Sequence, residues 1–85
     1  MKRRFEIVVS LKAGLLDPEG KTIQDSLPTM GWMNVSDVRV GKHVELTVDA
    51  ANEEEATTLA QDVAQRLLSN PVIEEFRILS AEDVR

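Results

Sequence analysis

The sequence LKAGLLDPEG, residues 11–20, joins an expected strand to an expected helix. The residues before it alternate between apolar and polar side chains, which is the period-two pattern of a half-buried strand. The apolar positions of that pattern are Phe5, Ile7, Val9 and Leu11. Within the stretch, Asp17 is a favoured helix N-cap residue, and Pro18 fits the first helical position, which needs no backbone donor. The sequence therefore predicts a strand that ends near Leu11 and a helix that begins near Pro18.

The first helix is expected to run from Pro18 toward Met30. Ile23, Leu27 and Met30 follow the spacing i, i+4, i+7 and give the helix one apolar stripe. Pro28 interrupts this pattern, because a proline inside a helix removes a hydrogen bond and clashes with the preceding turn. We expect the helix to end near Leu27 or to kink there.

Trp32 follows Gly31, the residue that is expected to close the first helix. The first interpretation of Trp32 is a lid over the core. The alternative is an exposed anchor for a partner, because tryptophan is enriched among interface hot spots.

Residues 35–49 are rich in β-branched side chains and are expected to be extended. A two-residue turn at Gly41 and Lys42 would pair the apolar face of one arm with the polar face of the other. Two alternatives remain: a hairpin with a three-residue loop over 41–43, or one long strand whose far end pairs with another subunit. His43 is interpreted as an exposed residue beside this bend, with a base or ligand as the alternative.

A second helix follows, with Asn52 as its N-cap and Asn70-Pro71 as its stop signal. Its apolar stripe repeats at helical spacing through Ala56, Leu59, Ala60, Val63, Ala64, Leu67 and Leu68. A final strand is expected to carry the apolar residues Val72, Phe76 and Ile78. Residues 81–85 are expected to form a frayed polar tail.

The order of these elements indicates a single α+β domain over residues 1–85. We expect a two-layer sandwich related to the ferredoxin-like fold, with an antiparallel sheet and two helices on one face. Its topology is either β-α-β-β-α-β or β-α-long β-α-β with a strand shared across a dimer. At 85 residues the core is small, so self-association is a plausible supplement to stability.

Composition excludes several function classes. The chain has no cysteine and one histidine, so disulfides and thiolate metal sites are impossible and no metal site is expected. A net charge of −5 opposes nucleic-acid binding. No apolar run approaches the length of a membrane span, and no secretory signal is visible, so a cytoplasmic location is expected.

No catalytic constellation can be identified in the sequence. The serines, threonines and single histidine do not form a triad pattern, and the four glycines show no phosphate-loop spacing. No catalytic or cofactor-binding residue is therefore expected on this chain.

Three phrases taken together give a resemblance to a known family. They are LKAGLLDPEG at 11–20, VRVGK at 38–42 and LLSNPVIE at 67–74. In order, spacing and overall length the chain resembles the PurS family, the small subunit of phosphoribosylformylglycinamidine synthase, from Phe5 to Leu79. The family often has Phe where this chain has Trp32 and Leu where it has Met30.

The resemblance implies an accessory role in a glutamine-dependent ligase of purine biosynthesis. In that enzyme the large synthetase subunit uses ATP, Mg and formylglycinamide ribonucleotide, and a glutaminase subunit releases ammonia from glutamine. The small subunit joins the two as a homodimer or tetramer and supports ammonia transfer to give formylglycinamidine ribonucleotide. No cofactor is implied on the small subunit itself.

The resemblance also points to candidate partner-interface residues. These are Asp17, Pro18, Gly20, Arg39, Gly41, Lys42, Asn70 and Pro71. Our hypothesis is that Arg39 and Lys42 contact the large subunit, because they are cations on an expected projecting turn. The alternative function is an ACT-like regulatory domain that binds an amino acid at a dimer interface, for which Gly14 after the first strand gives a weak signal.

Overall fold

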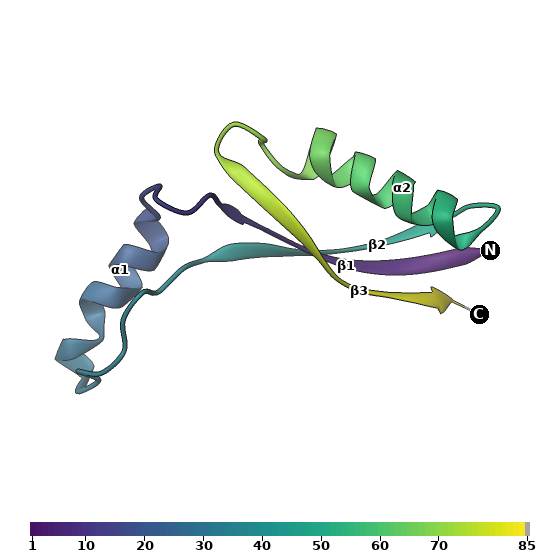
Figure 1. The fold of residues 1–85 in the computed structure, drawn as a ribbon. Coiled ribbons are helices and arrows are strands. Elements are labelled where there is room, and N and C mark those ends of the chain that lie inside the picture. Colours follow the sequence, from purple (N-terminus) through teal and green to yellow (C-terminus); the bar gives the residue numbers. More distant parts are fainter. Residues whose placement is uncertain (85) are drawn as a thin grey trace.

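The computed structural model describes residues 1–84 and contains a three-stranded antiparallel sheet in the order β2-β1-β3 (Figure 1). The elements along the chain are β1 (Lys2–Leu11), α1 (Pro18–Ser26), η1 (Pro28–Met30), β2 (Gly41–Asp49), α2 (Glu53–Val63), η2 (Ala64–Leu68) and β3 (Glu74–Val84). The expected α+β class and antiparallel sheet are confirmed. The long central strand β1 pairs with both neighbours along its whole length.

The alternation predicted for β1 is present, and its apolar side chains form the centre of the core. Phe5, Ile7 and Val9 are at most 1% exposed and pack in one cluster with buried residues of β2 and α2. Glu6 and Val8, which lie between them, point to the opposite face of the sheet, because successive side chains of a strand alternate. One face of the sheet is therefore apolar and covered, and the other is polar.

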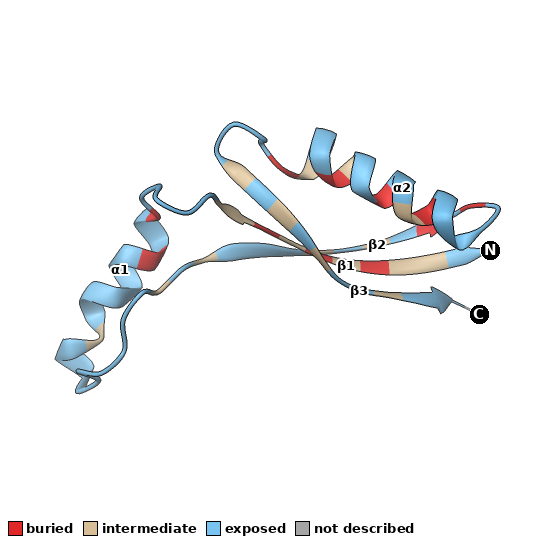
Figure 2. Cartoon of the chain, viewed as in Figure 1, coloured by how far each residue is buried: buried red, intermediate tan, exposed pale blue. Residues whose placement is uncertain are grey.

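Helix α2 covers the apolar face of the sheet through a row of small residues (Figure 2). Ala56, Ala60 and Ala64 have no exposed surface, and their spacing of four places them on one side of the helix. Leu59 and Leu67, which the sequence assigned to the same stripe, are 43% and 79% exposed. That part of the prediction was wrong, because the alanines lie closest to the sheet and the larger side chains flank them.

Helix α1 lies beyond the end of the sheet, away from α2 (Figure 1). Only α2 covers the sheet, so the expectation of two helices on one face differs from the structure at this point. The chain is correspondingly elongated, with extents of 53 × 29 × 14 Å. The apolar stripe of α1 is open to solvent: Ile23 is 45% and Met30 is 65% exposed. The helix ends at Ser26, as the prediction of an end near Leu27 requires, and Pro28 begins a separate 3₁₀ turn.

Residues 35–49 form no hairpin. Strand β2 starts at Gly41, which pairs with Ser10, and runs unbroken to Asp49, which pairs with Lys2. Residues 35–40 lead into it without strand pairing inside the described chain. The hairpin alternative is therefore wrong, and the strand covers the nine residues 41–49 and not the whole of 35–49; pairing of residues 35–40 with another subunit stays a prediction. His43 therefore lies within β2 and not on a turn.

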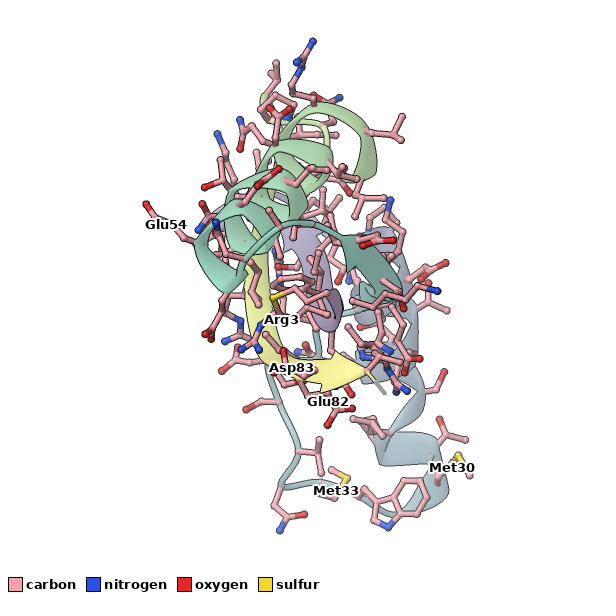
Figure 3. The ribbon with its side chains drawn as sticks, turned by 90° about the vertical axis from the view of Figure 1, so that its right-hand side faces the viewer. Arg3, Met30, Met33, Glu54, Glu82 and Asp83 are labelled. Atoms are coloured by element: carbon pink, nitrogen blue, oxygen red, sulfur yellow. The ribbon has the colours of Figure 1, made fainter. Side chains whose placement is uncertain are left out.

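The predicted tail is part of the sheet. Ala81 pairs with Phe5 and Asp83 pairs with Arg3, so β3 continues to Val84, while Arg85 lies outside the described residues. Figure 3 shows Arg3 beside Asp83, and their side chains form an ion pair of 2.7 Å. The acidic residues Glu82 and Asp83 fit into this strand because they lie opposite the cations Arg4 and Arg3 of β1.

Two further local predictions were wrong. Val72 belongs to a turn and not to β3, because the Val72 amide donates to the Asn70 side-chain oxygen at 3.1 Å. Trp32 is no lid, since it is 51% exposed beyond the end of α1. Met30 and Met33, 65% and 77% exposed, lie at the same tip (Figure 3).

Candidate functional site

The predicted interface residues come from three separate segments that lie near one end of the sheet. These are the loop before α1, the residues that lead into β2, and the loop between η2 and β3. We call this region the junction; its members are Asp17, Pro18, Gly20, Arg39, Gly41, Lys42, Asn70 and Pro71. A small pocket of about 290 Å³ is lined by four of them, Asp17, Pro18, Gly41 and Lys42. Val40, just before β2, and Glu74 of β3 also line it.

The Asp17 carboxylate is the centre of the junction. One oxygen accepts the Gly20 amide at 3.0 Å and caps α1, while the other accepts the Val40 amide at 2.7 Å. The side chain is buried, with 6% of the residue exposed. The amides of Gly20 and then Val40 hold the pKa of the Asp17 carboxyl below its ordinary value of 3.8; Arg39 adds to this effect and burial opposes it. One carboxylate thus joins α1 to the residues that lead into β2.

Two glycines of the junction are required by close approach of the backbone. A Cβ atom on Gly20 would lie 2.3 Å from the Val38 carbonyl oxygen and 2.7 Å from an Asp17 carboxylate oxygen. A Cβ atom on Gly41 would lie 2.8 Å from the Val9 carbonyl oxygen. Neither position has room for a side chain. Glycine at these positions therefore lets the backbone of Gly20 approach Val38, and that of Gly41 approach Val9, more closely than any other residue type would allow.

The two cations of the junction bind backbone carbonyls of their own chain. Arg39 donates to the Leu15 carbonyl at 2.9 Å, and its second nitrogen lies 3.4 Å from the Lys12 carbonyl. Lys42 donates to the Leu68 carbonyl at 3.3 Å, at the end of the helix where a cation is favoured. No projecting turn carries them, since both lie on one extended segment. Both side chains remain exposed, and their contact with a partner stays a prediction.

Asn70 and Pro71 form the third segment of the junction. The Asn70 carbonyl accepts the Glu74 amide at 2.7 Å, and the Asn70 amide donates to the Glu74 side chain at 2.8 Å. The Lys12 amide then donates to the Ile73 carbonyl at 2.9 Å. This loop is consequently joined to the one that precedes α1.

Sequence reasoning missed one cluster, which lies on the polar face of the sheet. Glu6 of β1 and His43 and Glu45 of β2 offer ligand atoms that all lie within 4.8 Å of one another. The signal that could have found it is strand parity: a single strand over 41–49 places His43 and Glu45 on the same face as Glu6.

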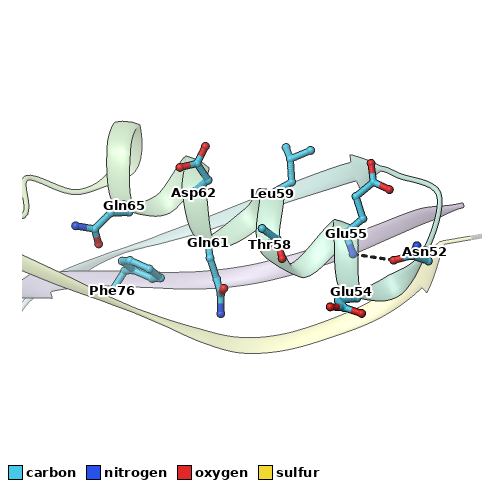
Figure 4. Close-up of a pocket in the computed structure, with 9 residues that line it drawn as sticks. All are labelled: Asn52, Glu54, Glu55, Thr58, Leu59, Gln61, Asp62, Gln65 and Phe76. Atoms are coloured by element: carbon cyan, nitrogen blue, oxygen red, sulfur yellow. Dashed lines mark hydrogen bonds between the residues drawn. The ribbon is translucent and has the colours of Figure 1, made fainter.

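A groove of about 850 Å³ runs between α2 and β3 (Figure 4). It is lined by Asn52, Glu54, Glu55, Thr58, Leu59, Gln61, Asp62, Gln65 and Phe76. Asn52 is engaged as a helix cap, because its side chain accepts the Glu55 amide at 2.8 Å. The acidic side chains are spread along the helix in Figure 4 and do not converge on one point. The groove therefore lacks the paired groups that acid–base chemistry needs.

Neither the junction nor the groove holds a nucleophile beside a base within residues 1–84. The junction's one carboxylate already accepts two backbone amides, and its cations already bind carbonyls. In the same residues, no helix is long and apolar enough to cross a membrane. The junction is organised to hold segments together, which is a structural task.

Comparisons with known proteins agree with the family resemblance. The family model PurS, described as phosphoribosylformylglycinamidine (FGAM) synthase, matches residues 4–82. The PurS subunit of Bacillus subtilis is 38% identical over 74 residues, which are 87% of each chain. The PurS structure from Thermus thermophilus covers both chains completely, with a TM-score of 0.86 and 32% identity. A chain of the PurLQS structure from Thermotoga maritima has a TM-score of 0.84 and 33% identity, covering 92% of this chain and 95% of that one. The chain belongs to the PurS family of FGAM synthase.

Proposed function

We propose that this chain is the small, non-catalytic subunit of an FGAM synthase and that it bridges the glutaminase subunit and the ATP-dependent synthetase subunit. The observation that carries the proposal is the match to PurS proteins over almost the whole chain, including a chain of PurLQS. The described residues add a well-organised fold without a catalytic constellation. ATP and Mg are used by the large partner, and the complex works in the cytoplasm.

A bridging subunit has a physical purpose in this reaction. Ammonia released from glutamine must reach the synthetase site as the neutral amine, because the ammonium ion is no nucleophile. A closed, poorly hydrated passage disfavours the charged form and prevents escape to solvent. The small subunit supports that transfer by holding the two active subunits in register.

The cations of the junction are the proposed contact with the large subunit. Arg39 and Lys42 are exposed and lie three residues apart on a chain with a net charge of −5, so they suit an acidic partner surface. Changing both to Glu should weaken assembly with the large subunit, measured by co-elution. Because both cations also bind backbone carbonyls, circular dichroism of each variant separates a loss of assembly from a loss of folding. Arg66→Glu, at an exposed cation of η2, is the matched control, and equal loss in the control would contradict the contact.

A second copy of this chain is the proposed cover for the exposed apolar surface. A nine-residue helix is marginal alone, yet α1 buries no large apolar side chain. Its tip exposes Met30, Trp32 and Met33 by 65%, 51% and 77%. We expect sedimentation to give a homodimer or tetramer, and Met30→Ser with Met33→Ser to shift it toward monomer. A monomer in the unaltered chain would contradict this part of the proposal.

Reconstitution tests the function directly. The synthetase and glutaminase subunits are assayed with and without this chain, using glutamine or free ammonia as the nitrogen source. Omission should abolish most glutamine-dependent formation of the amidine and leave ammonia-dependent formation largely intact. If omission changes neither activity, the proposal fails.

A further inference from the structure

The polar face of the sheet, opposite α2, carries a cluster that the proposed function does not use. Phe5 and Ile7 point into the core, so Glu6 between them points to the other face. Glu45 of β2 lies directly opposite Glu6 in the strand register, and His43 is two residues along the same strand. Three side chains with metal-binding chemistry thus rise from two adjacent strands of a rigid sheet.

Their spacing suits one shared cation. The His43 Nε2 atom lies 3.5 Å from a Glu6 carboxylate oxygen, and the ligand atoms of all three residues lie within 4.8 Å. Ligands about 2.1 Å from one tetrahedral ion lie about 3.4 Å apart, so side-chain rotations that bring these atoms about 1 Å closer complete the site. Two carboxylates directly opposite each other also repel, and a cation between them removes that cost.

Arg4 is the cation that already lies beside the two carboxylates. Its guanidinium lies 3.3 Å from a Glu45 oxygen and 3.9 Å from a Glu6 oxygen. The His43 Nε2 atom lies 3.5 Å from a Glu6 oxygen, which is longer than an ordinary hydrogen bond, so this ring is close to the carboxylates without being held by them. Arg4 thus competes with a bound ion for the two carboxylates.

We propose that Glu6, His43 and Glu45 bind a divalent transition-metal ion, with Zn²⁺ as the probe, and that the ion links β1 to β2. One imidazole nitrogen and two carboxylate oxygens form a donor set that zinc accepts, with water in the remaining positions. The composition argued against a metal site because it has no cysteine and one histidine. In the structure, His43 lies beside the carboxylates of Glu6 and Glu45, and nothing in the sequence indicated that Glu6 is close to it. This proposal is independent of the role in FGAM synthase.

Calorimetric titration of the tag-free chain with Zn²⁺ tests the site. One saturable equivalent is expected, and His43→Ala and Glu45→Gln should each weaken binding by about tenfold or more. Glu75→Gln removes the same charge from an exposed position of β3 and should leave binding unchanged. Arg4→Gln should tighten binding by about fivefold, because a competing cation is removed. The NMR signals of the single histidine should shift on addition of one equivalent.

Two results would overturn the proposal. The first is no saturable binding up to about 1 mM free Zn²⁺. The second is binding that His43→Ala weakens by less than about tenfold, which would place the ion elsewhere, for example at the amino terminus. Far-UV circular dichroism of each variant shows whether the sheet is intact. All the substituted side chains lie on the solvent-facing surface, so the fold is expected to survive.

Discussion

The two ends of the molecule are held by different forces. In the sheet half, which comprises β1, β2, α2, η2 and β3, apolar side chains are buried between one helix and the sheet. In the arm, residues 12–40, the buried residues are Asp17 and Gly20, and no large apolar side chain is buried. Directed hydrogen bonds and one close backbone approach join the beginning of the arm to its end, where both meet the sheet. Apolar burial stabilises one end, and a polar junction positions the other.

This difference explains why the arm suits a role in assembly. The sheet half buries its apolar cluster within one chain, although Leu67 and Leu79 at its surface are 79% and 51% exposed. The arm keeps its apolar side chains exposed and fixes its direction by a few hydrogen bonds, whose geometry is specific. A second chain or a partner subunit can therefore bury what the arm leaves open.

The largest expected effect is in the sheet half. Ile7 has no exposed surface, so Ile7→Ala should lower the free energy of unfolding by about 3 kcal/mol. Urea denaturation followed by circular dichroism measures it. Leu67→Ala, at a residue that is 79% exposed, is the control and should change stability by no more than about 0.5 kcal/mol. Similar losses in both variants would show that the buried cluster is not what stabilises the sheet half.

The next effect is specific to the arm. Gly20→Ala places a Cβ atom against the Val38 carbonyl and should destabilise the arm by about 2 kcal/mol. Trp32, the only tryptophan, lies in the arm, so its fluorescence reports this region while circular dichroism reports the helices and sheet together. Ser26→Ala, on the exposed side of α1, is the control. An unchanged Trp32 transition in Gly20→Ala would mean that the close approach is not maintained in solution.

A pH-dependent effect should follow from Asp17. Its folded pKa is depressed, so the ionised carboxylate stabilises the arm fully at pH values above the ordinary pKa of 3.8, and this contribution is lost as the pH falls through the folded pKa. Asp17→Asn should destabilise the arm at neutral pH and remove this part of the acid dependence. Thermal unfolding of both chains between neutral pH and pH 3, monitored by Trp32, measures it. Parallel pH profiles would contradict the role of the carboxylate.

The smallest effect is expected at Arg39. Its hydrogen bonds to the Leu15 and Lys12 carbonyls are exposed, so Arg39→Ala should cost about 1 kcal/mol of arm stability. Arg39→Lys should not restore it fully, because an ammonium cannot reproduce the fork of a guanidinium. Denaturation followed by Trp32 measures both variants, and full recovery in Arg39→Lys would reduce the role of Arg39 to its charge.

Local rules predicted the parts of the fold that depend on neighbours in sequence. The alternation in β1, the cap at Asp17 and the stop at Asn70 each follow from a few adjacent residues. The position of α1 did not follow, because amphipathicity shows which side of a helix is apolar and not what lies against it. The end of β3 was missed for a related reason: polar residues 81–84 form a strand only because β1 is long enough to pair with them.

The sequence predicted which residues belong to the candidate site, but not which contacts they make. The resemblance selected Asp17 and Gly20, and spacing alone could not show that they meet residues leading into β2. A turn at Gly41 would have sent the two cations outward; the unbroken strand instead lets them reach backbone carbonyls. Whether Glu6 and His43 lie close together on one face of the sheet depended on the same alternative, a hairpin or a single strand.

Native-state hydrogen exchange tests most directly whether the polar junction holds the arm. In Asp17→Asn, the amides of Gly20 and Val40 and those of α1 should exchange faster than in the unaltered chain. The amides of β1 around Ile7 should be unchanged, because they exchange through opening of the sheet half. Faster exchange confined to the arm is the result that the account predicts. An equal change in both regions, or none in the arm, would contradict it.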